Sequence, residues 1–431
     1  MSFTLAFIQL AIVLFVLVVE FNRRSIAIFF WGILCVIFSI PHLLSVVTGN
    51  YLYSSETMAM ASFFVIFFSL IYLLVRYIRL KRDSTPAGVK ALDIGSVVYR
   101  SGAMELFVVA AVVALTIWLV AFSSSFGGVL NATWGSMYEA TSTGGSLLLF
   151  FSAYVFACSG GAVIILWRDK RYLAFALLVI ACVAYLLITK NRVVMLATAC
   201  PFCLLFAAKY KTLSGKQIVV GALAVFAIVY IVYAILVFRH AGTVQTFLNS
   251  FSLESFNERV FSYMLAGEGE LGLRNIFYFF IEGNNNFVGF SEGASYVRIL
   301  LFWLPGSFSS GLKPDDFAVT MASAYMGNPF NQTYSVHPTF FGDAYANFGF
   351  FGIFLGVVWA VVFNCLDRWI ANIDSRAKPY VVSALAYAFV LIGRGSVYNG
   401  TVIGIVSIAL IFAAFFILER KRKAKTVLGQ D

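Results

Sequence analysis

The chain contains little charge. Aspartate, glutamate, lysine and arginine make up 12% of its 431 residues, which is about half the share found in a soluble domain. A soluble globular fold is therefore excluded. Histidine is also scarce, with only three residues, so each histidine can be considered separately.

Cysteine is sparse too, and its placement argues against disulfide bonds. All six cysteines lie in apolar runs, and none lies in the long segment of residues 239–343. A disulfide framework is therefore not expected. Cys200 and Cys203 form a C-x-x-C pattern around Pro201, but a redox pair needs an accessible thiolate. We interpret the pattern as a kinked membrane span rather than a redox or metal site.

What the chain does contain is a series of long apolar runs. Its residues are 61% hydrophobic and its mean hydropathy is +0.90. A membrane-spanning helix needs about 20 apolar residues, because the hydrocarbon layer is about 30 Å thick and every backbone polar group must be paired inside it. Residues Met1–Glu20 lack a basic start and an A-x-A site, so we expect a first span there rather than a cleavable signal peptide.

These runs predict an all-α polytopic integral membrane protein with about eleven transmembrane helices. The predicted spans are Phe3–Val19, Ile26–Val47, Met58–Tyr77, Ala103–Phe122, Ser146–Trp167, Tyr172–Ile188, Val193–Ala208, Ile218–Phe238, Ala344–Leu366, Tyr380–Ile392 and Val397–Leu418.

The basic residues indicate which side of the membrane each loop occupies. The net charge is +10, but the cations are scattered at helix ends rather than gathered on one face, so nucleic-acid binding is not expected. Counting from the loop at Arg23 and Arg24, alternate loops and the tail hold 22 of the 30 lysines and arginines. The positive-inside rule then places the N-terminus outside and the C-terminus in the cytoplasm. The remaining eight run against this rule: Lys190, Arg192, Arg239, Arg259, Arg274, Arg298, Lys313 and Arg394.

The predicted spans divide the chain into four parts. Residues 1–238 hold eight spans, residues 239–343 form one large loop on the non-cytoplasmic side, residues 344–418 hold three spans, and residues 419–431 form a basic cytoplasmic tail. The loop is too long for a simple connection and too apolar for a disordered linker. Its short apolar runs, Ile276–Ile281 and Val297–Leu304, suit helices that lie at the membrane interface or dip into it.

Several basic residues on the non-cytoplasmic side mark the ends of spans. Lys190 and Arg192 belong to a very short turn, and Arg394 lies between Gly393 and Gly395 in another. Such a cation either anchors a helix at the membrane edge or binds phosphate, since the arginine fork grips two phosphate oxygens. Both interpretations stay open from the residues alone.

Polar residues at the ends of the large loop are further candidates. His337 stands where the loop returns to the membrane, and histidine can accept a proton near neutral pH. Arg239 and His240 open the loop, with a structural and a functional role both open. Asp315 and Asp316 precede the apolar run Phe317–Met326, where they either cap a helix or act as an acid or metal ligand.

Two features near these candidates have simpler interpretations. His42, beside Pro41 near the end of the second span, is interpreted as structural. Gly349, Gly352 and Gly356 share one helix face at small-residue spacing, which predicts a close helix contact.

At these residues the chain resembles the Wzy-type O-antigen or oligosaccharide repeat-unit polymerases. The resemblance lies in the span arrangement with its long late loop, in the turn Lys190-Asn191-Arg192-Val193, and in the stretch Gly342–Gly349 that begins the next span. The chain also resembles the related O-antigen ligases, because His337, Thr339, Gly349 and Gly352 fit the ligase spacing. However, Ile353-Phe354-Leu355 replaces the Thr-Arg-Asn expected of a ligase, which favours the polymerase.

The resemblance implies a GT-C-like glycosyltransferase of the bacterial inner membrane, with its active site facing the periplasm. It implies an undecaprenyl-diphosphate-linked oligosaccharide as substrate, no cofactor, and a polysaccharide chain-length regulator as a partner. A metal-independent inverting transfer is the hypothesis. His337, as base, and Arg192 are the predicted catalytic residues, with Arg192, Arg239 and Arg394 on the diphosphate and Asp315, Asp316 and Asp343 as alternative bases. The predicted substrate-binding residues are Lys190, Arg239, His240, Asp315, Asp316, Asp343 and Arg394.

Two other functions remain open. A ligase would attach the finished glycan to a lipid core. A flippase would move lipid-linked oligosaccharide across the membrane, but such transporters usually show internal repeats, and none is evident in the sequence.

Overall fold

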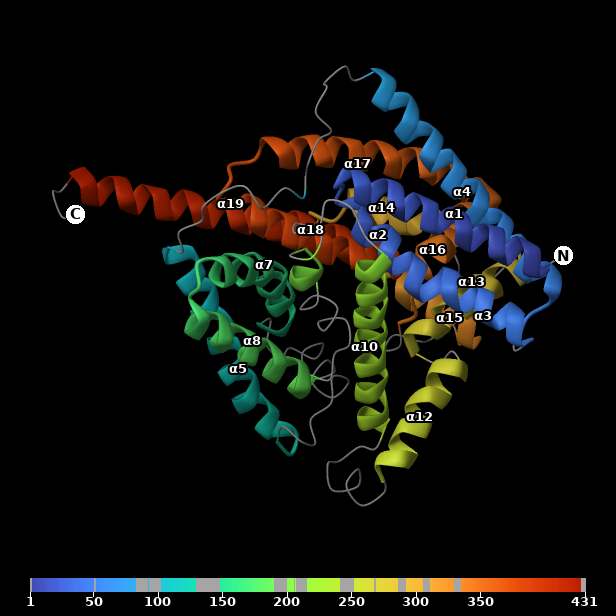
Figure 1. Ribbon diagram of the computed structural model, residues 1–431, viewed down its shortest axis with the longest axis horizontal. Coiled ribbons are helices and arrows are strands. Elements are labelled where there is room, and N and C mark those ends of the chain that lie inside the picture. Colours follow the sequence, from blue (N-terminus) through green and yellow to red (C-terminus); the bar gives the residue numbers. More distant parts are fainter. Residues whose placement is uncertain are drawn as a thin grey trace. The chain divides into compact units, whose positions relative to one another are not determined.

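The computed structural model describes most of the chain, and every regular element in the described part is a helix (Figure 1). The described residues are 2–49, 52–82, 92, 102–128, 148–189, 200–204, 206, 215–240, 252–266, 269–285, 292–304, 311–328 and 335–427. The predicted all-α class is confirmed.

Nine helical segments within the described residues are long and apolar enough to cross a membrane, so the protein is a multi-pass membrane protein. Of the other two predicted spans, Tyr380–Ile392 is found as a shorter apolar helix, Lys378–Gly393. Most of Val193–Ala208 lies outside the described residues. The nine segments are Phe3–Arg23, Ala27–Thr48, Ser55–Ile78, Ala103–Phe126, Phe151–Arg168, Tyr172–Thr189, Gly215–Val237, Thr339–Asn372 and Val397–Leu418.

The chain forms two compact units that alternate along the sequence. Unit 1 comprises Met1–Ala91, Met264–Ala371 and Ala388–Val402, and unit 2 comprises Leu92–Tyr263, Asn372–Tyr387 and Ile403–Asp431. Most of the predicted large loop, from Met264 onward, therefore belongs to the same unit as the first three spans. This grouping cuts across the four consecutive parts expected from the spans.

The helices of unit 2 are α5 (Ala103–Ser123), η2 (Ser124–Phe126), α7 (Leu148–Arg168), α8 (Tyr172–Thr189), α10 (Gly215–His240) and most of α12 (Leu253–Ala266), with parts of α18 (Lys378–Gly393) and α19 (Val397–Val427). Unit 1 begins with α1 (Ser2–Arg23), α2 (Ala27–Leu34), the π-helical turn η1 (Cys35–Ser39), α3 (Ile40–Thr48) and α4 (Ser55–Arg82). It continues with η3 (Gly269–Gly272), α13 (Leu273–Glu282), α14 (Ala294–Leu300), α15 (Phe317–Met326), α16 (Thr339–Phe348), η5 (Gly349–Phe354) and α17 (Leu355–Asn372).

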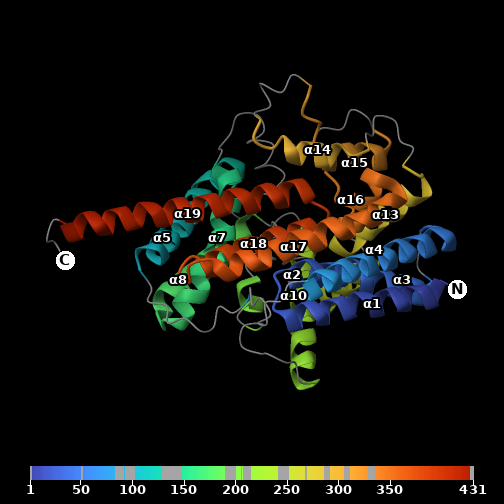
Figure 2. The same cartoon turned by 90° about the horizontal axis from the view of Figure 1, so that it is seen from above.

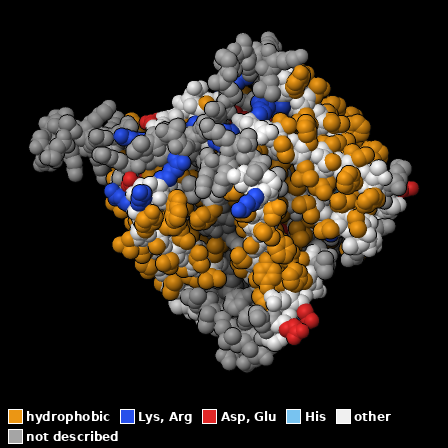
Figure 3. Space-filling model, in the orientation of Figure 1, with side chains coloured by type: hydrophobic (Ala, Val, Ile, Leu, Met, Phe, Trp, Pro, Cys, Tyr) orange, Lys and Arg blue, Asp and Glu red, His pale blue; other side chains and the backbone are white. Residues whose placement is uncertain are grey.

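The surface is apolar, as a lipid-facing surface must be. Phe7 and Phe15 on α1 and Ile117 on α5 are each more than half exposed. Apolar side chains cover most of the coloured surface in Figure 3. A water-soluble monomer rarely exposes contiguous apolar patches of this kind, so the surface agrees with burial in lipid. The six cysteines are all free thiols.

Aromatic side chains form the core of unit 1. Phe30 packs edge-on against Phe340, with ring centroids 4.9 Å apart, and stacks on Trp359 at 5.6 Å. Phe68 contacts both Phe340 and Phe341 at 5.5 Å. Such edge-to-face and stacked pairs stabilise beyond the area that they bury. They join α2, α4, α16 and α17 into one packed body.

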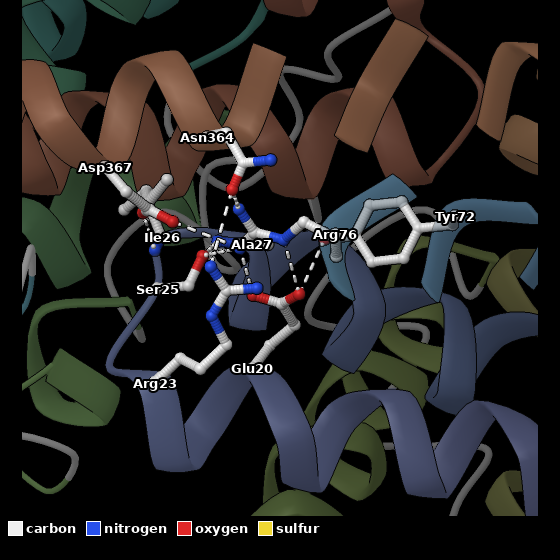
Figure 4. Close-up of polar contacts among 9 residues, drawn as sticks. All are labelled: Glu20, Arg23, Ser25, Ile26, Ala27, Tyr72, Arg76, Asn364 and Asp367. Atoms are coloured by element: carbon white, nitrogen blue, oxygen red, sulfur yellow. Dashed lines mark hydrogen bonds and ion pairs between the residues drawn. The ribbon is translucent and has the colours of Figure 1, made fainter. Parts of the chain in front are cut away.

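A buried charge cluster ties the ends of three helices together at one end of unit 1 (Figure 4). Arg76 of α4 donates through Nε to Glu20 of α1 at 2.8 Å and through Nη2 to Asp367 of α17 at 3.1 Å, and it also bonds Ser25 and Asn364. Arg76 is only 1% exposed. We call Glu20, Ser25, Arg76, Asn364 and Asp367 the inner charge cluster. It places the C-terminal ends of α1, α4 and α17 at the same end, as the predicted alternation of loops requires.

The chain reverses direction between α16 and α17, inside the stretch predicted as the span Ala344–Leu366. Gly349 has φ +56°, in the left-handed region that favours glycine. The rings of Phe340 and Trp359 are 5.5 Å apart although 19 residues separate them, whereas a straight helix would separate them by about 28 Å. Helix α16 therefore folds back on η5 and α17, and it packs against α13 (Figure 2). Helix α17, which continues this predicted span, begins at Leu355.

The three glycines make this reversal possible. A Cβ on Gly352 would lie 2.5 Å from the carbonyl oxygen of Ala344 in α16, and a Cβ on Gly356 would lie 2.7 Å from that of Phe68 in α4. The close helix contacts predicted from the glycine spacing are therefore confirmed for Gly352 and Gly356. Gly349 serves the turn instead.

Candidate functional site

The site begins at the turn between α18 and α19. Gly395 and Ser396 donate backbone hydrogen bonds to Ile392 and Leu391, which closes the helix end tightly. Gly393 packs directly on the side chain of Ile33 in α2. Ile33 lies seven residues beyond Ile26, or about 10 Å along the second span. The turn that carries Arg394 therefore packs against the body of the second predicted span, and its position relative to the membrane edge stays a prediction.

The end of the predicted large loop packs onto this turn. A Cβ on Gly395 would lie 2.8 Å from both the backbone nitrogen and oxygen of Thr339 and 2.9 Å from Cδ of Pro338, and its φ is +97°. Only glycine fits both the conformation and the space. Thr339 itself has φ +63°, which costs a β-branched residue about 1–3 kcal/mol and occurs most often at functional sites.

Arg394 forms a bidentate ion pair with Glu270 of η3. Its Nε donates to Oε2 at 2.6 Å and its Nη2 donates to Oε1 at 3.1 Å. The two side chains are 15% and 8% exposed. Fork-to-carboxylate pairs of this kind are strong and fix the orientation of the guanidinium. Glu270 was not among the residues singled out from the sequence.

His337 lies beside this pair. The pKa of His337 is lowered from 6.5 to about 3, chiefly by burial and also by the positive charge of Arg394, while Glu270 and a backbone hydrogen bond with Gly395 oppose the shift. The imidazole is therefore neutral at pH 7. Its Nδ1 is buried and has no hydrogen-bond partner within the described residues. An unpaired buried acceptor of this kind is a place for a hydroxyl or water donor.

Three polar side chains lie along one face of α16, beginning at the turn beside Gly395. Thr339, Asp343 and Asn347 follow one another at four-residue spacing, and all three are at most 1% exposed. Asn347 donates to the carbonyl of Asp343 at 2.8 Å and to its carboxylate at 3.3 Å. No cation in the described part of the chain forms an ion pair with Asp343, and the hydroxyl of Thr339 has no partner there.

The element that carries Glu270 is held firmly by the spans. Just after η3, Arg274 of α13 donates to Ser45 of α3 at 2.8 Å. Tyr278 of α13 bonds Nδ1 of His42 at 2.6 Å, and Nε2 of His42 bonds Ser62 of α4 at 2.7 Å. His42 is fully buried with both ring nitrogens bonded, so the structural interpretation made from the sequence agrees with its position.

Two other basic residues of the predicted loop surround Tyr398, one helical turn beyond Arg394. The Cζ of Arg298 lies 4.7 Å and the Nζ of Lys313 lies 5.9 Å from the centre of the Tyr398 ring. Arg298 also donates to the carbonyl of Pro314 at 2.6 Å. These cation–π contacts fasten the loop to the start of α19 and account for two of the eight cations that oppose the positive-inside rule.

Asp316 caps a helix, which was the simpler of its two interpretations. Its carboxylate accepts from the backbone nitrogen of Ala318 at 3.0 Å at the start of α15 and lies 3.8 Å from Arg298. Asp315 is exposed. Neither lies in the group formed by Glu270, His337 and Arg394.

The structure thus brings together His337 and Arg394, which are 57 residues apart in the sequence. Lys190 and Arg192 lie outside the described residues. Arg239 and His240 end helix α10 of unit 2, and only their backbone is described. The roles predicted for these four residues stay predictions.

Comparisons of the chain with protein-family models, curated proteins and solved structures gave no match.

Proposed function

We propose that the protein is a glycosyltransferase that polymerises undecaprenyl-diphosphate-linked oligosaccharide units into a surface polysaccharide at the periplasmic face of a bacterial inner membrane. The observation that carries the proposal is the convergence of Arg394, Glu270 and His337 beside the buried start of α16. A cation with a fixed fork next to a neutral imidazole suits a reaction with a phosphate leaving group and a hydroxyl nucleophile. The resemblance to repeat-unit polymerases supports the same chemistry.

Arg394 is the residue proposed to bind the diphosphate. When the bond between the sugar and the diphosphate breaks, the diphosphate leaves with the electron pair and gains negative charge. A cation oriented in advance stabilises that charge in the transition state. Glu270 occupies Nε and Nη2 of Arg394, so Nη1 is the part of the fork left for a phosphate oxygen.

His337 is the residue proposed to take the proton of the acceptor hydroxyl as its oxygen bonds the sugar. A pKa of about 3 makes the unliganded imidazole a weak base. The negative charges of a bound diphosphate oppose the effect of Arg394 and raise that pKa. Donor binding thereby makes His337 a stronger base. Before the donor binds, the low pKa keeps the imidazole unprotonated, and afterwards it can accept the proton of the acceptor hydroxyl.

A deletion strain tests the proposal. Loss of a polymerase leaves a single repeat unit on the lipid core, whereas loss of a ligase leaves none. We expect plasmids encoding the wild-type chain to restore the polysaccharide ladder on a gel, and plasmids encoding Arg394→Ala or His337→Ala to leave single repeats. A normal ladder from either variant, with the protein present in the membrane, would remove that residue from the mechanism.

A transporter of lipid-linked oligosaccharide is the second candidate, and the reversal at α16 favours it. Transporters often place a broken helix with its N-terminus beside an anionic substrate, within the membrane. Purified protein in detergent has no second compartment. Chain lengthening there would support the polymerase, and its absence together with movement of the lipid in vesicles would support the transporter.

A further inference from the structure

The pairing of Glu270 with Arg394 leaves one end of the arginine fork unused. A guanidinium offers five N–H donors in one plane. Glu270 takes the edge formed by Nε and Nη2, at 2.6 and 3.1 Å. Within the described residues Nη1 of Arg394 has no hydrogen-bond partner. The carboxylate therefore fixes the plane of the cation without blocking its outer end.

Glu270 is presented by a rigid part of unit 1. It is buried, and α13, which follows η3 directly, is held by the bonds from Arg274 to Ser45 and from Tyr278 to His42. A carboxylate on such a support cannot follow a mobile partner. It holds the guanidinium of Arg394 in one orientation. The backbone of Arg394 is held as well, because the next residue, Gly395, packs tightly against Thr339.

We propose that Glu270 is a positioning residue that holds Arg394 so that its free Nη1 end meets the phosphate of the lipid-linked donor. The identity of the ligand rests on the proposed function. The pair carries no net charge, so Glu270 adds no attraction for an anion and contributes orientation only. Orientation matters most in the transition state, where a misplacement of about 1 Å can cost a factor of about 100 in rate.

A different role for Glu270 predicts the opposite result. If its carboxylate were a stand-in that the diphosphate must displace, removing Glu270 would free Arg394 and tighten donor binding. If Glu270 only stabilised the fold, its removal would lower activity by the same factor whatever residue stood at position 394. A double-mutant cycle separates these roles from positioning.

The cycle uses purified full-length protein in detergent and lipid-linked repeat units extracted from the deletion strain. The variants are Glu270→Ala, Arg394→Lys and the double variant. We expect Glu270→Ala to lower kcat about 30- to 100-fold while KM stays within about threefold, because orientation acts on the transition state. In the Arg394→Lys background, where no fork remains to be oriented, Glu270→Ala should change kcat by less than about twofold.

An equal fall in both backgrounds, or a lower KM with an undiminished rate, would overturn the proposal. Glu254→Ala, at an exposed glutamate of α12, is the matched control and should leave the rate unchanged. If Glu270→Ala fails to fold, Glu270→Gln, which keeps one acceptor oxygen, replaces it in the same cycle.

A binding measurement separates this proposal from the proposed function. If the wild-type protein does not lengthen chains, polymerisation is excluded, and affinity for undecaprenyl diphosphate then tests Glu270. Free undecaprenyl diphosphate carries in full the leaving-group charge that the donor develops only in the transition state, so we expect Glu270→Ala to weaken this affinity at least tenfold although KM for the repeat unit changes little. Equal or tighter binding, or no binding by the wild-type protein, would overturn the positioning role.

Discussion

Gly395 is the residue on which the geometry of the site depends most directly. Its backbone has φ +97°, and a Cβ there would lie 2.8 Å from the backbone of Thr339. Gly395→Ala therefore imposes a left-handed conformation that costs about 1–2 kcal/mol and also forces the turn away from residues 338 and 339. We expect lower thermal stability and loss of the polysaccharide ladder. Gly221→Ala, in helix α10 with open space around it, is the control and should retain both.

The buried state of His337 makes the stability of the protein depend on pH. The folded state holds the pKa of His337 near 3, whereas an unfolded histidine titrates near 6.5. Between these values the unfolded state binds more protons, so stability is complete above pH 6.5 and falls as the pH is lowered. Between pH 6.5 and 5 this loss is at most about 2 kcal/mol.

Comparing thermal unfolding of the wild-type protein with that of His337→Asn at pH 7 and pH 5 measures this effect. The wild-type protein should lose more stability on acidification than the variant. An equal loss in both proteins would show that His337 is not held in its neutral form by the fold.

Asp343 offers a test of function against stability. Its carboxylate is 1% exposed, and no described cation pairs with it. An uncompensated buried charge is costly, and an amide side chain at this position would keep the oxygen that accepts from Asn347. We expect Asp343→Asn to unfold at an equal or higher temperature than the wild-type protein. A polysaccharide ladder lost from such a stable variant would assign Asp343 to the reaction, whereas a normal ladder would remove it.

Some residues of the candidate site can be identified from the sequence, and others cannot. His337 and Arg394 were recognisable because a histidine is rare here and an arginine between two glycines opposes the positive-inside rule. Glu270 was not, because its partner lies 124 residues away. Local spacing would instead have paired Glu270 with Arg274, four residues on, yet Arg274 bonds Ser45 of α3.

Among the elements, α16 determines where the site lies. The sequence predicted a close contact from Gly349, Gly352 and Gly356 but placed it in one continuous helix. Hydropathy could not show the reversal, because α16 and α17 are both apolar. The reversal appears only in contacts between distant residues, such as the Phe340 and Trp359 rings. Because of this reversal, the start of α16 packs against α2, where Phe340 contacts Phe30.

Gly352 provides the test of this hairpin. A Cβ at Gly352 would lie 2.5 Å from the backbone oxygen of Ala344, so Gly352→Ala must push α16 away from η5. We expect a loss of about 1–3 kcal/mol in stability and a loss of polymer. Unchanged thermal stability and an unchanged ladder would mean that α16 and η5 do not pack in this way. Gly221→Ala again serves as the control.

At the scale of the molecule, the inner charge cluster holds three spans of unit 1 in register. Arg76→Ala would leave the carboxylates of Glu20 and Asp367 buried without their cation. Breaking a buried ion pair costs about 3–5 kcal/mol, so we expect a large fall in thermal stability or in the amount of protein in the membrane. Arg376→Ala, at an exposed residue of the turn after α17, should have little effect. Equal behaviour of the two variants would contradict the cluster.

The membrane class of the whole molecule could be predicted because it depends only on the length and apolarity of each segment. Nine of the eleven predicted spans correspond to long apolar helical segments within the described residues. The grouping into two alternating units could not be predicted, because it depends on which helices pack together. Spans in an apolar solvent carry no strong local signal for their partners.

In the proposed mechanism, Arg394 and His337 serve a single transfer reaction on a lipid diphosphate. The most direct measurement incubates the purified protein in detergent with lipid-linked repeat units and separates the products by length on a gel. We predict a ladder with the wild-type protein and with Arg376→Ala, and unextended units with Arg394→Ala and His337→Ala. A wild-type protein that makes no ladder, or an Arg394→Ala protein that makes a full one, would contradict this mechanism.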